Sequence, residues 1–167
     1  MKRIVNLDSL QPGLIGARLP GAPALYDGAA VAPIAPLVGA RRLGYNLTVV
    51  PPGKAAFPFH SHYGNEEMFF ILEGRGELRY GDERHPLRAG DVVACPPGGP
   101  DSAHQIRNTS VDAELRYLAV STTQSPDMFH YPDSGKTGAS HYPESGDAGV
   151  VRLRNRIDHN LDYWDGE

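Results

Sequence analysis

The sequence has little cysteine, no long apolar run and no excess of positive charge. Its single cysteine, Cys95, excludes an intrachain disulfide, and we expect its side chain to be a small buried hydrophobe. No stretch approaches 18 consecutive apolar residues, and no apolar run follows the basic start, so we expect no membrane partner, no secretory signal and a cytoplasmic location. With 16 basic against 20 acidic residues the net charge is −4, which argues against nucleic acid as a partner.

Helical periodicity is missing as well. No window of ten or more residues presents one apolar helical face, whereas 19 glycines and 15 prolines among 167 residues exceed average usage. Hydrophobic residues make up 40% of the chain, so the composition is not that of a disordered segment. A chain of this length buries about two thirds of its unfolded surface in one domain. The composition therefore predicts a single all-β domain of short strands and tight turns.

The first two regions of the chain differ in pattern. Residues 1–43 are rich in Gly, Ala and Pro, and they predict an N-terminal arm with one or two short strands around 30–39. Residues 44–121 predict the barrel core, because apolar runs alternate with turn residues at intervals of about ten. The strands predicted in this core are 44–50, 67–72, 77–80, 91–94, 104–108 and 114–121.

Residues 122–167 become polar again and predict a C-terminal extension that packs on the barrel. We expect one strand at 149–153 and a hydrophobic clasp at Trp164. The segment 131–136 has the residues of a turn, and its Lys136 either meets an anionic substrate or is a solvated lysine.

The segment 59–70 carries most of the chemistry. In an extended backbone His60 and His62 point the same way, roughly 7 Å apart, so their imidazoles can converge on one metal ion. Glu67 opens the next apolar run and can add a carboxylate, and His104 at the start of a later strand is a fourth candidate. Such a mixed set leaves coordination positions open for water, substrate or dioxygen. Taken alone, however, the His-x-His pair is weak evidence, because exposed histidines beside aromatic residues are common.

The wider pattern resembles the two motifs of the cupin superfamily. The first, a glycine followed by two histidines, a glutamate and a second glycine, reads Gly53, His60, His62, Glu67 and Gly74. The second, a glycine followed by Pro-x-Gly, a histidine and an asparagine, reads Gly90, Pro96-Pro97-Gly98, His104 and Asn108. Six residues separate Glu67 from Gly74, which selects Glu67 over Glu66. The resemblance covers about residues 44–121, and the gap before His104 is longer than usual.

The resemblance implies a double-stranded β-helix, or jelly-roll barrel, with N- and C-terminal arms. It also implies that His60, His62, Glu67 and His104 hold one divalent transition metal ion, with manganese, iron, zinc, nickel and cobalt all open. The implied function is a metal-dependent enzyme acting on a small oxygen-rich metabolite, as a sugar or sugar-phosphate isomerase, a dioxygenase or a decarboxylase. The alternative is a non-catalytic module that binds a small molecule or sugar. No residue is assigned as catalytic, and whether the protein is an enzyme stays open.

Five side chains are candidates to contact a small-molecule ligand near the metal. They lie on predicted barrel strands or near the barrel mouth: Tyr45, Asn46, Phe69, Arg116 and Lys136. An error of one residue in facing would exchange members of this set for their neighbours. The strand at 67–72 is apolar on both faces, so we expect a homodimer in which strands of the N-terminal arm pack across the interface.

Overall fold

The computed structural model describes residues 2–143 and 149–167. Its helices are short: α1 (Ile15–Arg18), α2 (Ala35–Val38) and 3₁₀ turns at Leu7–Ser9, Ala24–Tyr26, Pro100–Ser102, Pro132–Ser134 and Ile157–His159. Its strands are β1 (Gly13–Leu14), β2 (Ala30–Pro33), β3 (Leu43–Val50), β4 (Ser61–His62), β5 (Glu67–Glu73), β6 (Arg75–Tyr80), β7 (Glu83–Arg88), β8 (Val92–Cys95), β9 (His104–Asn108), β10 (Leu115–Thr122), β11 (Asp127–Tyr131), β12 (Lys136–His141) and β13 (Val151–Arg156). In these two ranges no helix has the length and hydropathy to cross a membrane.

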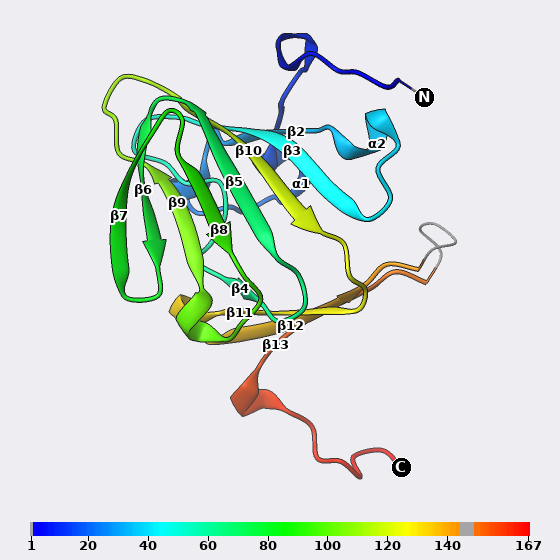
Figure 1. Ribbon diagram of the computed structural model, residues 1–167. Helices are drawn as coiled ribbons and strands as arrows, with labels where there is room; N and C mark the ends of the chain where they lie inside the picture. The colour runs from blue at the N-terminus through cyan, green and yellow to red at the C-terminus, as the bar shows by residue number, and fades with distance from the viewer. Residues whose placement is uncertain (1, 144–148) are drawn as a thin grey trace.

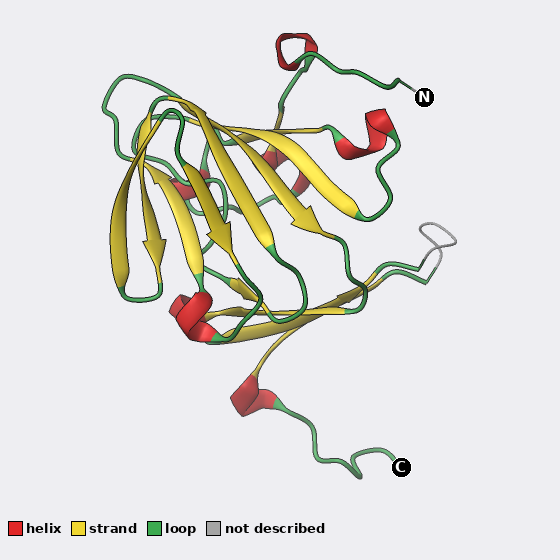
Figure 2. Cartoon of the chain, in the orientation of Figure 1, coloured by secondary structure: helices red, strands yellow, loops and turns green. Residues whose placement is uncertain are grey.

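The strands form three antiparallel sheets (Figure 1; Figure 2). A six-stranded sheet has the order β1-β2-β3-β10-β5-β8, and a three-stranded sheet has the order β7-β6-β9. A four-stranded sheet, β13-β12-β11-β4, lies across the lower end of the barrel in Figure 1. Isolated bridges from Ala55 to Arg107 and from His60 to His104 tie the segment before β4 to β9. The predicted all-β jelly-roll barrel is confirmed.

The predicted core strands all appear, as β3, β5, β6, β8, β9 and β10. Strand β7 was not predicted from the sequence, because only one of its six side chains, that of Leu87, is buried. The arm strand predicted around 30–39 is confirmed only as β2, since residues 35–38 form α2. The strand predicted at 149–153 occurs as β13, which begins two residues later.

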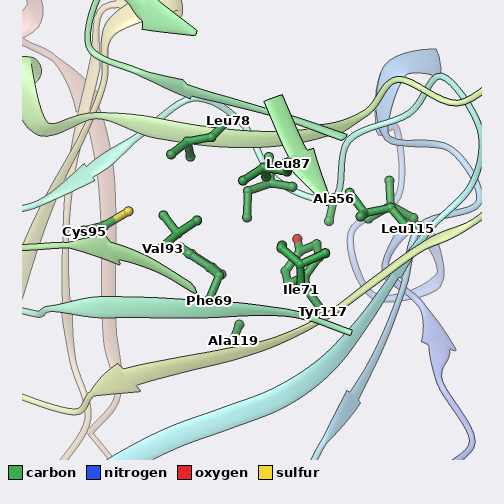
Figure 3. Close-up of a cluster of buried hydrophobic side chains, with 13 residues drawn as sticks. Ala56, Phe69, Ile71, Leu78, Leu87, Val93, Cys95, Leu115, Tyr117 and Ala119 are labelled. Carbon is green, nitrogen blue, oxygen red and sulfur yellow. The ribbon is translucent and has the colours of Figure 1, made fainter. Parts of the chain in front are cut away.

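The barrel interior is filled by alternating side chains of the strands. Phe69 and Ile71 of β5 meet Leu115 and Tyr117 of β10 in one continuous cluster (Figure 3). Full burial of a side chain of this size contributes about 1.5–3 kcal/mol. Cys95 belongs to the same cluster with 1% exposure, which confirms it as a buried hydrophobe.

The N-terminal arm covers part of the outer face of the six-stranded sheet. Leu47 of β3 is buried there against Ala32 and Ile34. Partly buried residues of the arm and the sheet pack around them: Leu7, Leu10, Val38, Tyr45, Val49, Leu72 and Leu118. The arm of the same chain therefore accounts for part of the apolar outer face of β5.

The prediction that Trp164 clasps the barrel is wrong. Its side chain is 72% exposed and that of Tyr163 is 83% exposed. The two rings pack on each other instead, with centroids 4.8 Å apart. The chain after β13 runs away from the barrel (Figure 1), because aspartates flank both aromatic residues and favour solvent over an apolar face.

Candidate metal centre

Three neighbouring segments carry the four predicted ligands. His60 precedes β4, His62 ends β4, Glu67 opens β5 and His104 opens β9. The backbone of His60 and that of His104 exchange two hydrogen bonds, with N···O distances of 3.2 and 2.8 Å. This pairing sets the two imidazole rings side by side, with centroids 5.0 Å apart. The barrel therefore assembles ligands that lie far apart in sequence.

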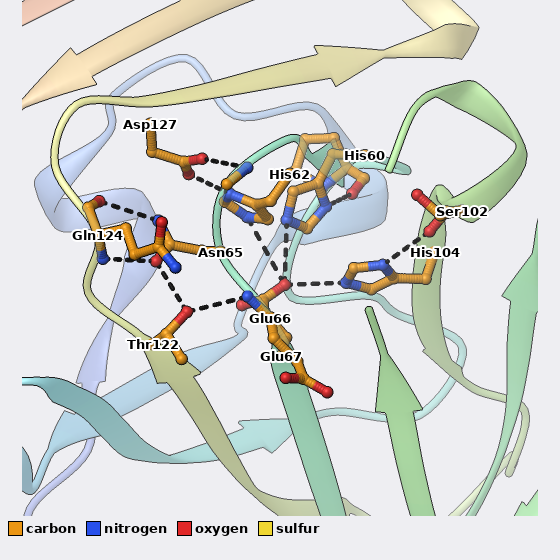
Figure 4. A network of polar contacts seen from close by, with 12 residues as sticks. His60, His62, Asn65, Glu66, Glu67, Ser102, His104, Thr122, Gln124 and Asp127 are labelled. Atoms are coloured by element: carbon orange, nitrogen blue, oxygen red, sulfur yellow. Dashed lines mark hydrogen bonds and ion pairs between the residues drawn. The ribbon is translucent and has the colours of Figure 1, made fainter. Parts of the chain in front are cut away.

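The side chains converge on one oxygen of Glu67 (Figure 4). Its Oε2 lies 2.9 Å from Nε2 of His104, 3.6 Å from Nε2 of His62 and 3.7 Å from Nε2 of His60. The ligand atoms of His60, His62 and Glu67 all lie within 4.8 Å of one another. Neighbouring ligands of an ion with bonds of about 2.0–2.2 Å sit about 3.0–3.4 Å apart. The spacing therefore suits a single metal ion.

Each histidine has its other ring nitrogen already engaged. Nδ1 of His60 lies 2.8 Å from the Pro58 carbonyl, and Nδ1 of His104 lies 3.3 Å from the Ser102 carbonyl. A carbonyl oxygen only accepts hydrogen bonds, so Nδ1 of His60 carries the proton and donates it, which in the neutral ring leaves Nε2 with the lone pair that binds a metal. The His104 ring has an acceptor at both nitrogens, because its Nε2 also lies 2.9 Å from the Glu67 carboxylate.

The electrostatics of the cluster favour these ligand states. Burial first of all lowers the pKa of His60 to about 4, so this imidazole is neutral at pH 7. Burial alone would raise the pKa of Glu67, but the hydrogen bond with His104 and the three histidine charges outweigh it and hold that pKa below its usual value. The cluster is thus one carboxylate facing three imidazole nitrogens, and Nε2 of His104 donates a hydrogen bond to that carboxylate. One carboxylate together with three imidazoles is a ligand set that fits a divalent transition-metal cation.

Asp127 also belongs to the candidate centre, although no sequence pattern marks it. Its carboxylate is buried and its Oδ2 accepts a hydrogen bond from Nδ1 of His62 at 2.6 Å. Its Oδ1 accepts from the backbone N–H of Gly64 at 3.1 Å. Because the proton of His62 is held on Nδ1, Nε2 is directed at Glu67. Asp127 comes from β11, which pairs with β4 through His62.

A second missed residue, Asn65, fixes the loop before Glu67. Its Oδ1 accepts from the Thr122 hydroxyl at 2.9 Å and from the Gln124 backbone N–H at 2.6 Å. Its Nδ2 donates to the Gln124 carbonyl at 3.1 Å, and the Thr122 hydroxyl accepts from the Glu66 backbone N–H. The loop before β5 is thereby joined to the end of β10 (Figure 4).

A cavity of about 1060 Å³ lies over the candidate centre. His60 and His62 form part of its wall, with Tyr131 stacked on His60 at 6.0 Å and Phe129 edge-on to His62 at 6.2 Å between ring centroids. Apart from Pro143, the remaining wall residues have polar side chains: Arg41, Arg42, Asn65, Thr122, Thr123, Gln124, Ser125, Asp127, Ser140, His141, Tyr142 and Arg154. The volume is at the upper end of the range for ligand sites.

Two of the five residues predicted to contact a ligand lie elsewhere, so these assignments are wrong. Tyr45 faces the outer side of β3 and packs with the arm cluster. Arg116 alternates with the buried Leu115 and Tyr117, so it faces outward, where its guanidinium lies 3.6 Å from the Glu73 carboxylate. Successive side chains of a strand point to opposite faces of the sheet, and the sequence alone did not determine which face these two residues occupy.

The other three lie nearer the centre. Phe69 is buried with its ring centroid 5.6 Å from that of His104. Asn46 shares the inner face of β3 with Thr48, whose hydroxyl donates to its Oδ1 at 2.7 Å. Lys136 lies with Nζ 5.3 Å from the ring centroid of Tyr131, the residue that stacks on His60. Only Phe69 thus contacts a predicted ligand directly.

Known proteins with similar sequences match part of the chain. The profile of the family described as Cupin domain matches residues 46–121. An uncharacterised protein of Methanocaldococcus jannaschii is 37% identical over 60 residues, which are 36% of this chain and 47% of that protein. An oxalate-binding protein of Thermotoga maritima is 35% identical over 71 residues, which are 42% of this chain and 54% of that protein. The chain thus spans about half the length of these two relatives.

One solved structure matches almost the whole chain. It is described as a sugar phosphate isomerase from a cupin superfamily, from Silicibacter pomeroyi. It is 25% identical, has a TM-score of 0.75 and covers 97% of this chain and 98% of its own. The family match, the jelly-roll barrel and this shared architecture lead to one conclusion: residues 46–121 of the chain form a cupin domain.

Proposed function

We propose that the protein binds one divalent transition metal ion through His60, His62, Glu67 and His104, and that it is a metal-dependent enzyme acting on a small oxygen-rich metabolite. The observation that carries the proposal is the convergence of three Nε2 atoms on one oxygen of Glu67. In each ring the opposite nitrogen, Nδ1, lies within hydrogen-bond distance of a carbonyl or carboxylate oxygen. This donor set suits manganese, iron, nickel, cobalt or zinc.

The reaction we favour is isomerisation of a sugar or sugar phosphate. The similarity to a structure described as a sugar phosphate isomerase extends over 97% of this chain and supports this choice. When bound, the metal would act as a Lewis acid that polarises a substrate oxygen. Isomerisation also needs a titratable group that is not a ligand. Tyr131 and His141 both line the cavity and meet that requirement.

The alternative function is a binding module without turnover. It is favoured by the 35% identity to an oxalate-binding protein over 71 residues, which are 42% of this chain. The two functions differ in one observable. An isomerase exchanges a carbon-bound hydrogen of a sugar phosphate with solvent, whereas a binding module returns the sugar phosphate unchanged.

We also propose that the chain forms a homodimer through its N-terminal arm. Three leucines of the arm region, Leu14, Leu19 and Leu37, are 45–63% exposed. Strand β1 is a two-residue edge of the six-stranded sheet. Exposed apolar residues beside a free sheet edge favour pairing with a second copy. Light scattering would show twice the chain mass of 18.1 kDa, and a monomer would refute the dimer.

Metal analysis tests the ligand assignment directly. Protein purified without chelator or affinity tag is expected to carry about one ion per chain by elemental analysis. The double variant His60→Ala, His62→Ala is expected to lose it while keeping the β-sheet circular dichroism signal, because the core lies apart from these side chains. His85→Ala is the matched control, since His85 is half exposed on β7 beside Glu83. Stoichiometric metal in the double variant would contradict the assignment.

Turnover is tested on the metal-loaded protein. Sugar phosphates are incubated in deuterium oxide and examined by proton NMR for loss of a carbon-bound proton. Metal-dependent loss that disappears in the double variant supports an isomerase. Unchanged sugar phosphates, together with metal-dependent binding of oxalate, support the binding module.

A further inference from the structure

Arginine is concentrated on the wall of the cavity above the candidate metal centre. Arg41 and Arg42 lie in the loop between α2 and β3, and Arg154 lies on β13. The chain as a whole is acidic, with a net charge of −4, so this concentration is not a general property of the surface. Asp127 is the one carboxylate among the lining residues that the structure describes, and it is engaged by His62 and Gly64.

In the part of the chain that the structure describes, no carboxylate pairs with the three guanidinium groups. Elsewhere arginines pair with carboxylates, as Arg79 does with Asp133 and Arg84 with Glu77. Within residues 2–143 and 149–167 no such ion pair involves an arginine of the cavity wall. The guanidinium of Arg154 instead lies over the ring of Phe129, 5.6 Å from its centroid. Phe129 in turn lies edge-on to His62, so this arginine is one aromatic ring away from a predicted ligand.

We propose that Arg41, Arg42 and Arg154 form an anion subsite, which binds an oxyanion group of the same ligand whose other end reaches the metal. A phosphate ester and a carboxylate share this chemistry, and guanidinium groups bind both through paired N–H donors. The proposal rests on the proposed function, because it names the second anchor of that ligand. A cavity of about 1060 Å³ has room for a ligand with two such ends.

The positive wall also has a kinetic consequence. Charges of one sign at the mouth of a cavity raise the local concentration of a ligand of the opposite sign. A neutral sugar would gain nothing from the three arginines, whereas its phosphate ester would be drawn in and held. The subsite therefore distinguishes anionic from neutral ligands of the same size.

Phosphate binding to the metal-free protein tests the subsite separately from the metal. The full chain is stripped with a chelator, and ³¹P NMR line broadening measures its affinity for inorganic phosphate, with acetate as a competing probe. The test variant is Arg42→Gln, Arg154→Gln, and the single variants are measured beside it. The control is Arg84→Gln, which removes one positive charge from an exposed position outside the cavity and so matches each single variant. Circular dichroism confirms folding, which we expect to persist because the two arginines are exposed.

The expected result is phosphate binding by the native chain and the control, weakened about tenfold or more in the double variant. Weaker binding of phosphate than of acetate would still support an anion subsite, with a carboxylate as its ligand. Absence of phosphate and acetate binding at tens of millimolar, or equal affinities in the double variant and the control, would overturn the proposal. Metal uptake is measured in parallel. Loss of metal binding with intact phosphate binding would refute the proposed function alone.

Discussion

The hydrogen bond from His62 to Asp127 predicts a measurable loss of metal affinity in Asp127→Asn. The carboxylate of Asp127 accepts from two donors, Nδ1–H of His62 at 2.6 Å and the backbone N–H of Gly64 at 3.1 Å. An asparagine has one carbonyl oxygen, so either His62 or Gly64 would face an N–H₂ group. His62 would then lose its charged partner and part of its fixed ring orientation.

Loss of such a partner typically weakens metal binding about 10- to 100-fold, equal to about 1.4–2.7 kcal/mol. The assay is a zinc titration in competition with a chromophoric chelator. The NMR signal of the His62 Nδ1 proton provides a readout that a merely structural role would not move. Asp133→Asn is the control, because Asp133 is 57% exposed in its ion pair with Arg79 and lies outside the cluster. Equal zinc affinity in the two variants would refute the role assigned to Asp127.

Three further predictions concern stability and reactivity. Burial raises the pKa of the Cys95 thiol to about 12, so at pH 8 a disulfide reagent should leave Cys95 untouched until the chain is denatured, and rapid native labelling would count against this burial. Gly74 has φ 87° and a Cβ there would overlap the Glu114 carbonyl oxygen, so Gly74→Ala should cost more than about 1–2 kcal/mol in urea unfolding, with Gly90→Ala (φ 93°, open space) as control. His60 has a folded pKa of about 4 against 6.5 unfolded, so the unfolded chain binds more protons between these values. The unfolding free energy of the metal-free protein should therefore fall as pH drops from 6.5 to 4, and a slope unchanged in His60→Gln would contradict this cause.

Local patterns made the barrel core predictable from sequence. Strand β9 has the bounds predicted for it, His104–Asn108, because polar turn residues end the alternation on both sides. Strand β7 lacks this signal, since five of its six side chains are exposed and it is held by its pairing with β6. Strands β11 and β12 are short and flanked by prolines. Such strands are stabilised by pairing with neighbouring strands rather than by their own amino-acid composition.

Distance along the chain limited what could be predicted of the site. Asp127 and His62 are 65 residues apart, and they meet because β11 pairs with the two-residue strand β4. No local pattern marks either strand, so the sequence could not bring these two side chains together. Facing was the other limit: Tyr45 and Asn46 are neighbours on β3, yet one packs under the arm and the other faces inward. Because side chains alternate between the two faces of a strand, an error of one residue moves every predicted side chain of that strand to the opposite face.

The cavity wall bears on which of the two proposed functions is correct. The family match covers residues 46–121. Of the described residues that line the cavity, only His60, His62 and Asn65 lie within that match. Every other lining residue comes from residues 41–42 or 122–154. The ligand motifs thus lie within the cupin match, whereas most of the cavity wall is built from parts outside it. The structure described as a sugar phosphate isomerase extends over those parts. If ligand choice resides in the wall, similarity over the whole chain is the better guide to the substrate, and the arginine variants should alter ligand preference while leaving metal affinity unchanged.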